Sequence, residues 1–486
     1  MMMQESYSVN TNSHKDTLVF GTDGWRDVIG DKFTARNLKR AAQAYADYLR
    51  AQGTPRVLVG YDTRFNGSMF AEVVAQVLAA NNLDVQLASS YIPTPMLSFA
   101  TKQLGAGGAV MLTASHNPPP YLGFKLKGPY GGTATSDIYE AVDTRTQALD
   151  DSNVQSFDTN NHHYEQLDAK DAYFEALAKL VDIDALQGLT GKFVYDAMGG
   201  AGCGYLADFF ERYGISLELT PLRNTADPMF YGVNPEPLPQ NLASTTAYMA
   251  DKGRDALFAA VTDGDADRIG VVLPGGAFFN SHQIFAVLLD MLSNKGLSGR
   301  VVKTVTTSRI VERLAEKRGL DVVETPVGFK YIVGEMLKGD VLIGGEESGG
   351  IGVHGHIPER DGLANTLLLL ECVAKTGKGL AELFRDIEQE TGWKHAYDRL
   401  DLHLSGNDLK NAVLKSLESP PESIASREVM SVERRDGVKL NLSDNAWVLF
   451  RASGTEPVLR IYCEAASSSE VSTILGAANT FVQSHA

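Results

Sequence analysis

The stretch Ala106-Gly-Gly-Ala-Val-Met-Leu-Thr-Ala-Ser-His-Asn-Pro118 joins a run of small apolar residues to a polar turn. The apolar part, Ala106 to Leu112, predicts a buried strand, and Asn117 with the three prolines that follow it predicts the turn. Ser115 is therefore expected at a strand end, where open α/β sheets place their active sites. Taken alone, Ser115, Asn117 and Pro118 are also ordinary turn-forming residues, so the meaning of the serine depends on the rest of the chain.

Strand and helix patterns alternate through the first 400 or so residues, which predicts α/β domains with mixed, largely parallel sheets. The expected helices are Thr34–Arg50, Met69–Asn81, Ala169–Leu180 and Ser308–Arg318, and the expected strands are Thr17–Phe20, Val57–Val59, Lys192–Tyr195, Ala256–Val261, Ile269–Leu273, Val301–Thr304, Asp321–Glu324 and Val341–Ile343. Asp23 to Arg26 is expected to form a turn. After about residue 400 shorter strands alternate with helices, which predicts a smaller α+β domain at the C-terminus.

The length of 486 residues predicts several domains, since a domain takes roughly 150 residues. Hydrophobic residues make up 44% and charged residues 21% of the chain, as in globular proteins. The polar stretch 150–163 has no apolar period and marks a first linker. We place the domains at residues 1–165, 166–297, 298–399 and 400–486.

The net charge of −16 argues against nucleic acid or an anionic membrane as a partner, because both bind clustered Lys and Arg. The three cysteines, Cys203, Cys372 and Cys463, are far apart and have no metal-ligand spacing, which suits a reducing cytoplasm. The polar N-terminus has no signal-peptide core, and no apolar run approaches membrane-spanning length. We expect a cytoplasmic protein.

Three aspartates alternate with small residues in Asp263-Gly-Asp-Ala-Asp267, directly after an expected strand. In an extended segment this spacing puts all three carboxylates on one face. Three oxygen ligands on one side suit Mg²⁺, which takes few protein carboxylates and completes its shell with phosphate or water. Arg268 and Pro274 stand where an EF-hand needs Gly and Glu, so a calcium loop is excluded. The alternative reading is a polar turn.

Two later loops offer groups that bind sugars and anions. Gly344-Gly-Glu-Glu-Ser-Gly-Gly350 carries two carboxylates and a hydroxyl on a flexible backbone, a set that can hydrogen-bond vicinal sugar hydroxyls. Arg451-Ala-Ser-Gly-Thr-Glu-Pro457, followed by Arg460, presents guanidinium groups, hydroxyls and backbone amides to one anion. Either segment could instead be an ordinary surface loop.

Two further residues are candidates for acid/base chemistry. Lys125 follows Ser115 by ten residues and could return to it across a short loop, and His356 lies in the segment 355–362. A lone lysine is more often a solvated charge and a lone histidine more often structural. The glycine-rich turn 198–203 lacks the full dinucleotide-binding pattern, so we interpret it as close packing between a strand and a helix.

In this order the motifs closely resemble the α-D-phosphohexomutase superfamily, and the match spans nearly the whole chain. The main motifs are Thr113-Ala-Ser-His-Asn-Pro118, Asp263-Gly-Asp-Ala-Asp-Arg268, Gly345-Glu-Glu-Ser348 and Arg451-Ala-Ser-Gly-Thr-Glu-Pro457, and the supporting segments are Phe20-Gly-Thr-Asp-Gly-Trp-Arg26, Gly60-Tyr-Asp-Thr-Arg64, Asn234-Pro-Glu-Pro-Leu238 and Thr325-Pro-Val-Gly-Phe-Lys330. The resemblance implies four domains around a central cleft, each of which gives one loop to the active site.

The resemblance also implies a role for each motif. The serine carries a phosphoryl group, the aspartates bind Mg²⁺ together with it, the Glu-x-Ser loop reads sugar hydroxyls, and a hexose 1,6-bisphosphate is the intermediate and activator. The matching residues are Ser115, Asp263, Asp265 and Asp267 for the metal, Arg268, Gly328, Lys330, Glu346, Ser348 and Arg360 for the substrate, Arg451, Ser453, Gly454, Thr455 and Arg460 for phosphate, and Arg26, His116, Lys125 and His356 for catalysis.

Two positions depart from the family pattern. Leu122 stands where members often carry Asn, which affects the expected surroundings of Lys125. Arg360 stands where the phosphoglucomutase branch usually has Lys, although the segment Gly352 to Gly362 otherwise resembles that branch. Glu-Glu-Ser in the sugar loop also favours glucose phosphate.

The first hypothesis is a phosphoglucomutase that interconverts α-D-glucose 1-phosphate and glucose 6-phosphate as a monomer or small homo-oligomer. Phosphomannomutase activity, dual specificity and glucose 1,6-bisphosphate synthesis stay open as variants. An aspartate-nucleophile phosphatase is a second class, because Asp263-x-Asp265 after a strand has that shape and would make Ser115 dispensable. A sugar-phosphate binder without turnover is a third.

Overall fold

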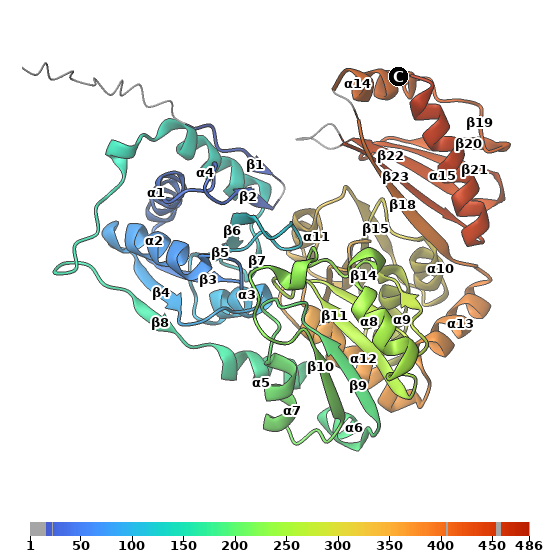
Figure 1. Cartoon of the computed structure of the whole chain (residues 1–486), viewed down its shortest axis with the longest axis horizontal. Helices are drawn as coiled ribbons and strands as arrows, with labels where there is room; N and C mark the ends of the chain where they lie inside the picture. The colour runs from blue at the N-terminus through green and yellow to red at the C-terminus, as the bar shows by residue number, and fades with distance from the viewer. Residues whose placement is uncertain (1–15, 22, 405–406, 453–457, 486) are drawn as a thin grey trace, which may run out of the picture.

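The computed structural model describes residues 16–21, 23–404, 407–452 and 458–485, and within them the strands form four separate sheets. Three mixed sheets follow one another along the chain, and an antiparallel sheet ends it (Figure 1). The expected α/β architecture with a smaller C-terminal domain is confirmed. Within the described ranges, no helix is both long and apolar enough to cross a membrane.

The first sheet is built around the strand that leads to Ser115. Its order is β1-β2-β6-β5-β3-β4-β8, with β7 paired to β6, and β5 runs parallel to β3 and antiparallel to β6. The strands are β1 Phe20–Gly21, β2 Gly24–Val28, β3 Arg56–Tyr61, β4 Asp84–Ala88, β5 Gly108–Leu112, β6 Tyr121–Gly128, β7 Gly132–Thr133 and β8 Glu165–Leu167, and the helices are α1 Ala35–Gln52, α2 Gly67–Ala80, α3 Thr94–Gln103 and α4 Ser136–Ala148.

The prediction for the start of this domain is wrong in two places. Gly24–Val28 forms a strand where a turn was expected, and the strand expected at Thr17–Phe20 is only Phe20–Gly21. Gly24 has a φ of 95°, and a Cβ there would lie 2.4 Å from the Phe124 carbonyl oxygen, so the glycine permits close strand pairing. The buried indole of Trp25 then holds the strand in the core.

The second and third sheets each combine parallel strands with an antiparallel edge. Their orders are β10-β9-β11-β12-β13 and β15-β14-β16-β17. The elements of the second are α5 Lys170–Leu180, α6 Ile183–Gly188, β9 Lys192–Asp196, α7 Tyr205–Arg212, β10 Glu218–Leu222, α8 Ala243–Asp251, β11 Ala256–Thr262, β12 Ile269–Val272 and β13 Phe278–Phe279, and those of the third are α9 Ser281–Asn294, β14 Arg300–Thr304, α10 Arg309–Lys317, β15 Val322–Thr325, α11 Phe329–Met336, β16 Val341–Gly345, β17 Ile351–Val353, α12 Gly362–Thr376 and α13 Leu380–Thr391.

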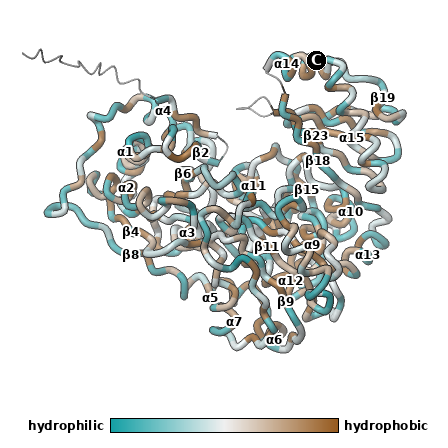
Figure 2. The backbone as a smooth tube through the Cα atoms, viewed as in Figure 1, coloured by the Kyte–Doolittle hydropathy of each residue, from teal (hydrophilic) through white to brown (hydrophobic). Residues whose placement is uncertain are grey.

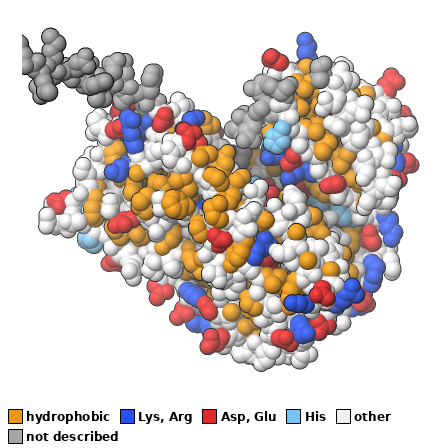
Figure 3. Space-filling model, in the orientation of Figure 1, with side chains coloured by type: hydrophobic (Ala, Val, Ile, Leu, Met, Phe, Trp, Pro, Cys, Tyr) orange, Lys and Arg blue, Asp and Glu red, His pale blue; other side chains and the backbone are white. Residues whose placement is uncertain are grey.

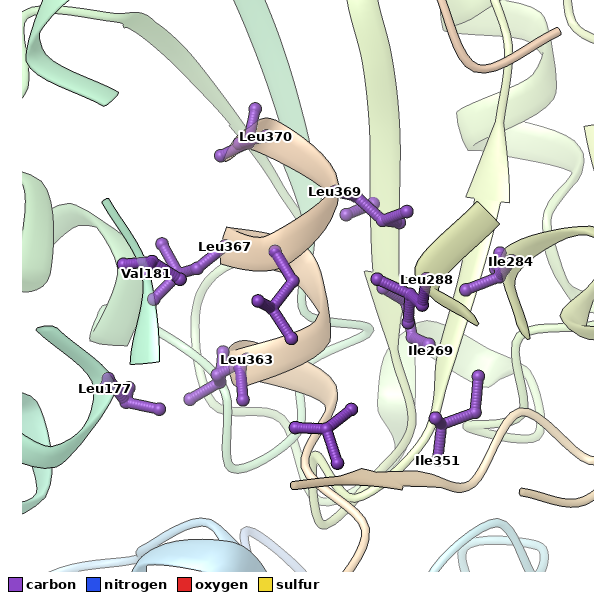
Figure 4. Close-up of a cluster of buried hydrophobic side chains, with 14 of the residues drawn as sticks. Leu177, Val181, Ile269, Ile284, Leu288, Ile351, Leu363, Leu367, Leu369 and Leu370 are labelled. Carbon is purple, nitrogen blue, oxygen red and sulfur yellow. The ribbon is translucent and has the colours of Figure 1, made fainter. Parts of the chain in front are cut away.

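Helix α12 packs between the second and third domains and is buried on all sides over its first three turns. Asp361 caps its start by accepting a hydrogen bond from the Ala364 amide, and Gly377 ends it in a left-handed conformation. Leu363 and Leu367 face α5, while Leu369 faces α9 (Figure 4). A helix that is apolar all round requires such burial. The hydrophobic segments accordingly gather around α9, α12 and β11 (Figure 2).

The C-terminal domain is an antiparallel sheet of order β18-β23-β22-β21-β20-β19. Its elements are β18 Ala396–His403, α14 Asn407–Ser416, β19 Ser423–Ile424, β20 Arg427–Glu433, β21 Val438–Leu442, β22 Trp447–Ala452, β23 Val458–Ala465 and α15 Ser468–Gln483. Figure 3 shows a deep notch between this domain and the first domain.

Candidate active site

Ser115 lies in a strained turn directly after β5. Its φ is 51°, its amide donates to the Thr113 hydroxyl at 2.8 Å, and the side chain is almost fully buried. The Ser115 hydroxyl lies 2.9 Å from Oδ2 of Asp263, although the two residues belong to different domains. The loop that carries Ser115 and the loop that carries the three aspartates are therefore in direct contact.

The three aspartates do not lie in an extended segment, as the spacing argument assumed. The chain turns between β11 and β12, with Ala266 at a φ of 60°, and Asp263 Oδ1 accepts hydrogen bonds from the amides of Asp267 and Arg268. The turn still brings the carboxylates together: one oxygen from each lies within 4.8 Å of the others, and all three residues are buried. The one-sided cluster thus arises from a turn and not from strand alternation.

The aspartate cluster fits a divalent cation. Oδ1 of Asp265 and both carboxylate oxygens of Asp267 are buried without a hydrogen-bond partner among the described residues. Burial, together with the neighbouring carboxylates Asp265 and Asp267, raises the pKa of Asp263 well above its usual value. Hard oxygen ligands in this arrangement suit Mg²⁺, whose charge would balance oxygens that accept no hydrogen bond, although Oδ2 of Asp267 also forms an ion pair with Arg360.

Lys125, on β6, is bound by carboxylates. Its Nζ lies 3.0 Å from Asp265, 3.1 Å from Asp23 and 3.7 Å from Asp267. Burial alone would lower the pKa of Lys125, but Asp23 and Asp265 raise it, so the ammonium stays charged. Among the described contacts it has none to Ser115. Leu122 packs into the core of the first domain, so its departure from the family pattern fills an apolar site.

His116 and Arg26 lie beside the serine. His116 Nδ1 is 3.4 Å from the Ser115 hydroxyl. Burial lowers the pKa of His116 well below its usual value, and the charges of Arg268 and Arg26 lower it further, so the ring is neutral. The Arg26 guanidinium donates to Asn117 at 3.0 Å and to Asp23 at 3.0 Å. A neutral imidazole next to a hydroxyl can accept a proton.

Arg360 connects the sugar loop, residues 344–350, to the same site. Arg360 contacts Asp267 at 2.7 Å, Asp23 at 3.5 Å and Glu346 at 3.8 Å. Glu346 accepts the Gly328 amide at 2.9 Å, and burial raises its pKa to about 7. The remaining predicted substrate residues lie nearby or on neighbouring elements: Arg268 contacts Glu236 at 3.4 Å, Ser348 is in the turn after β16, and Lys330 is near the start of α11.

His356 lies apart from these groups. Its Nε2 is 2.8 Å from Asp361, the cap of α12, which also accepts from the Tyr173 hydroxyl at 2.8 Å. Among the described residues its contacts include neither Ser115 nor the aspartates. The structure therefore places His356 where it supports the start of α12.

The C-terminal domain supplies the arginines predicted to bind phosphate. Arg451 lies 3.0 Å from Asp436, which also accepts the Val327 amide at 2.9 Å, and Arg460 lies 3.9 Å from Asp401. Ser453, Gly454 and Thr455 fall outside the described residues. Asp436 thus links Arg451 to the segment beside Gly328 in the third domain.

Three residues around the serine and aspartate loops had no predicted role. Arg64 donates to the Ser115 carbonyl at 2.8 Å and to three further carbonyls of that loop, Thr94 donates to Asp265 at 2.7 Å, and Asp23 pairs with Lys125, Arg26 and Arg360. Asp23 and Arg64 lie in segments that resemble the family, so the resemblance could have indicated that these two residues belong to the site. Nothing in the sequence around Thr94 pointed to the site.

Family models for the four phosphoglucomutase/phosphomannomutase domains match the chain. Alpha/beta/alpha domains I, II and III match residues 17–153, 171–276 and 280–391, and the C-terminal domain matches residues 409–478. A phosphoglucomutase/phosphomannomutase of Thermococcus kodakarensis is 31% identical over 92% of this chain and 95% of its own length. The chain belongs to the phosphoglucomutase/phosphomannomutase family. Its members are isomerases of the intramolecular phosphotransferase class.

Other phosphoglucomutase/phosphomannomutase family relatives carry different substrate names. A phosphoglucosamine mutase of Thermobifida fusca is 31% identical over 94% of this chain and 96% of its own length. A crystal structure from Thermus thermophilus, named as a candidate phosphomannomutase, is 44% identical, has a TM-score of 0.87, and covers 96% of this chain and 99% of its own. Membership is therefore shown, while the names of relatives leave the hexose open.

Proposed function

We propose that this family member is a phosphoglucomutase that interconverts α-D-glucose 1-phosphate and glucose 6-phosphate through phosphorylated Ser115. The observation that carries the proposal is the 2.9 Å contact between the Ser115 hydroxyl and Asp263, inside a buried cluster of carboxylates. A hydroxyl at that point can bear a phosphoryl group whose charge would be balanced by a cation in the carboxylate cluster and by the nearby Arg26, Arg268 and Lys125. Mg²⁺ held by Asp263, Asp265 and Asp267 would supply electrostatic stabilisation of the transferring group.

The proposed reaction consists of two phosphoryl transfers, and each transfer moves a different phosphoryl group. The phosphorus–oxygen bond to Ser115 breaks while a bond forms to the free hydroxyl of the hexose phosphate, and that hydroxyl loses its proton to a base. His116, whose Nδ1 lies 3.4 Å from the serine oxygen, is proposed as this base, because the negative charge of phosphorylated Ser115 would raise the lowered pKa of the ring. The resulting 1,6-bisphosphate turns over and returns its other phosphoryl group to Ser115.

Reorientation of the intermediate requires a site that recognises a phosphate at either end of the sugar. Arg451 and Arg460 are proposed to hold the phosphate that is not reacting, while Glu346 and Ser348 accept or donate hydrogen bonds to sugar hydroxyls. The Glu346 carboxylate is already fixed by the Gly328 amide and faces Arg360. Fixed acceptors of this kind support hydroxyl recognition.

Glucose is the proposed hexose because of the Glu-Glu-Ser sequence and the phosphoglucomutase-like segment before α12. Phosphomannomutase, dual-specificity and glucose 1,6-bisphosphate synthase activities are the variants to compare. We propose a cytoplasmic enzyme, since Cys203, Cys372 and Cys463 are all buried free thiols, a pattern that suits a reducing compartment. A monomer or small homo-oligomer that binds phosphosugars is the expected form.

The test is a panel of hexose 1-phosphates, assayed with Mg²⁺ and catalytic amounts of the matching 1,6-bisphosphate. Wild type should act best on α-D-glucose 1-phosphate, and Ser115→Ala should lose mutase turnover by a factor of at least about 10³. Intact-mass measurement before and after incubation with the bisphosphate should show one added phosphoryl group in wild type only. Full activity of Ser115→Ala would rule out the phosphoserine route and favour a phosphatase-like aspartate nucleophile.

A further inference from the structure

One face of the C-terminal sheet carries three arginines at neighbouring positions. Arg460 of β23 pairs with Arg451 of β22 on one side and with Asp401 of β18 on the other. Residues paired directly across an antiparallel sheet share a face, and so do residues two apart along a strand. Arg399, two residues before Asp401, therefore faces the same side. Arg451 and Arg460 match the family's phosphate loop, whereas Arg399 has no assigned role.

The Arg399 side chain extends along the strand toward Arg460. Its Nε lies 3.0 Å from Oδ1 of Asp401, and the Nε of Arg460 lies 3.9 Å from the same oxygen. The Arg460 Nε is buried and has no hydrogen-bond partner within the described ranges. Asp401 thus lies between two guanidinium groups. Among the described residues, the Nε–H of Arg460 is still free to donate a hydrogen bond.

The three arginines remain accessible to a ligand. Their side chains are 24%, 36% and 17% exposed for Arg399, Arg460 and Arg451. Asp401 and Asp436 pair directly with the three guanidinium groups, and these pairs leave several guanidinium N–H donors without a carboxylate partner among the described residues. Such a set suits a phosphate, which offers several acceptor oxygens at once.

The sugar loop acts electrostatically on Arg399. Burial would lower the pKa of Arg399, but Asp401 raises it, and the carboxylate of Glu347 adds to that effect. Glu347 acts in the same direction on Arg451. Glu347 is the residue between Glu346 and Ser348, and Thr306 donates to it at 2.5 Å. Arg399 and Arg451 therefore share an electrostatic interaction with the same residue of the sugar loop.

We propose that Arg399 is a third arginine of the phosphate site and that it donates to the non-reacting phosphate on the side nearest the sugar loop. The inference rests on the proposed function, because the ligand is taken to be a hexose phosphate. Asp401 holds Arg399 and Arg460 in place while the site is free, which reduces the ordering needed when phosphate binds.

The test measures binding and turnover separately in Arg399→Ala, Arg399→Lys and wild type. Calorimetric titration with glucose 1-phosphate and with glucose 6-phosphate should show Kd about 10-fold higher in Arg399→Ala for both ligands, since a charged hydrogen bond is lost. KM should rise by a similar factor while kcat changes less than about threefold. Arg399→Lys should recover part of the affinity, because it restores charge without the planar fork.

Arg427→Ala is the matched control. Arg427, on β20 of the same sheet, pairs with Asp444 at 3.1 Å and Glu470 at 2.8 Å, and its side chain is 17% exposed. It should bind both ligands as wild type does. Unchanged Kd in Arg399→Ala, or an equal loss in Arg427→Ala, would overturn the proposal. Binding without mutase turnover in wild type would instead refute the proposed function, and the Kd values would still report on Arg399.

Discussion

Lys125 Nζ lies 3.0 Å from Oδ2 of Asp265, and both side chains are fully buried although they come from the first and second domains. The ammonium offsets part of the negative charge of the aspartate cluster. Burial would raise the pKa of Asp265, but Lys125 and a hydrogen bond from Thr94 hold it below its usual range. The cluster is thus stabilised by a cation from the protein as well as by any metal it binds.

Replacing Lys125 with Met should destabilise the protein by about 3–5 kcal/mol, because it leaves the buried carboxylate of Asp265 without its ion-pair partner. Added Mg²⁺ should recover part of the loss, since the metal would bind the same carboxylates. Thermal unfolding with and without Mg²⁺ measures both effects. Lys170→Met, which removes an exposed pair with Asp208, should cost no more than about 1 kcal/mol and show no response to Mg²⁺.

Removal of divalent metal should abolish mutase turnover, and Mg²⁺ should restore it. Asp265→Asn should weaken Mg²⁺ binding by at least about tenfold, because it removes an anionic ligand. Activity and calorimetry over an Mg²⁺ titration give the two values. Asp255→Asn, which alters an exposed pair with Lys192, is the control and should titrate as wild type. Equal activity in chelator and in Mg²⁺ would contradict a metal role for this cluster.

Glu346 should make stability depend on pH. Burial raises its pKa from 4.5 to about 7, so between these values the folded protein binds a proton that the unfolded chain releases. The contribution is therefore full below about pH 4.5 and is lost as pH rises through about 7. Without ligand, Glu346→Gln should match wild type near pH 4.5 and be more stable at pH 8, by up to about 3 kcal/mol.

Thermal unfolding of both proteins from pH 4.5 to 8 measures this difference. The exposed Glu175, which pairs with Arg212, offers a control: the Tm difference between Glu175→Gln and wild type should stay constant across that range. A constant difference for Glu346→Gln as well would contradict the prediction.

Arg360→Lys tests why arginine stands where lysine is usual in the phosphoglucomutase branch. The guanidinium reaches Asp267, Asp23 and Glu346, and lies 5.1 Å above the Phe329 ring. Lysine offers one compact charge and cannot span these groups. We expect a loss of about 1–3 kcal/mol in stability and a KM for glucose 1-phosphate raised by about 5-fold or more. Arg318→Lys, near the surface, should leave KM unchanged.

Much of the fold could be predicted because local patterns and tertiary structure agree. The small apolar run before Ser115 forms the fully buried β5. Thr34, the expected first residue of a helix, is the N-cap of α1, which begins at the next residue. Gly24–Val28 escaped prediction because its pairing with β6, nearly 100 residues away, outweighs the local turn preference of Asp and Gly. Pairing between strands that are far apart in the sequence cannot be predicted from a short stretch of residues.

The candidate site also has a part that the sequence predicts and a part that it does not. Clustering of Ser115 with the aspartates followed from motifs that each end a strand. The partners of those motifs did not, because they depend on contacts across domains: Glu359 pairs with Lys127, 232 residues earlier, and fixes the backbone just before Arg360. His356 is the opposite case. Its imidazole suits acid/base chemistry, but in the structure it contacts Asp361, the cap of α12.

Helix α12, enclosed by α5, α9, β11 and β12, implies that the second and third domains unfold as one cooperative unit. Cutting the chain between them would expose leucines on both new surfaces, so either piece expressed alone should aggregate. The C-terminal domain has a separate core, and a smaller buried cluster joins it to the third domain, where Val305 packs against Trp447, Leu449 and Tyr462. Limited proteolysis should therefore cut outside the second and third domains and leave that unit intact.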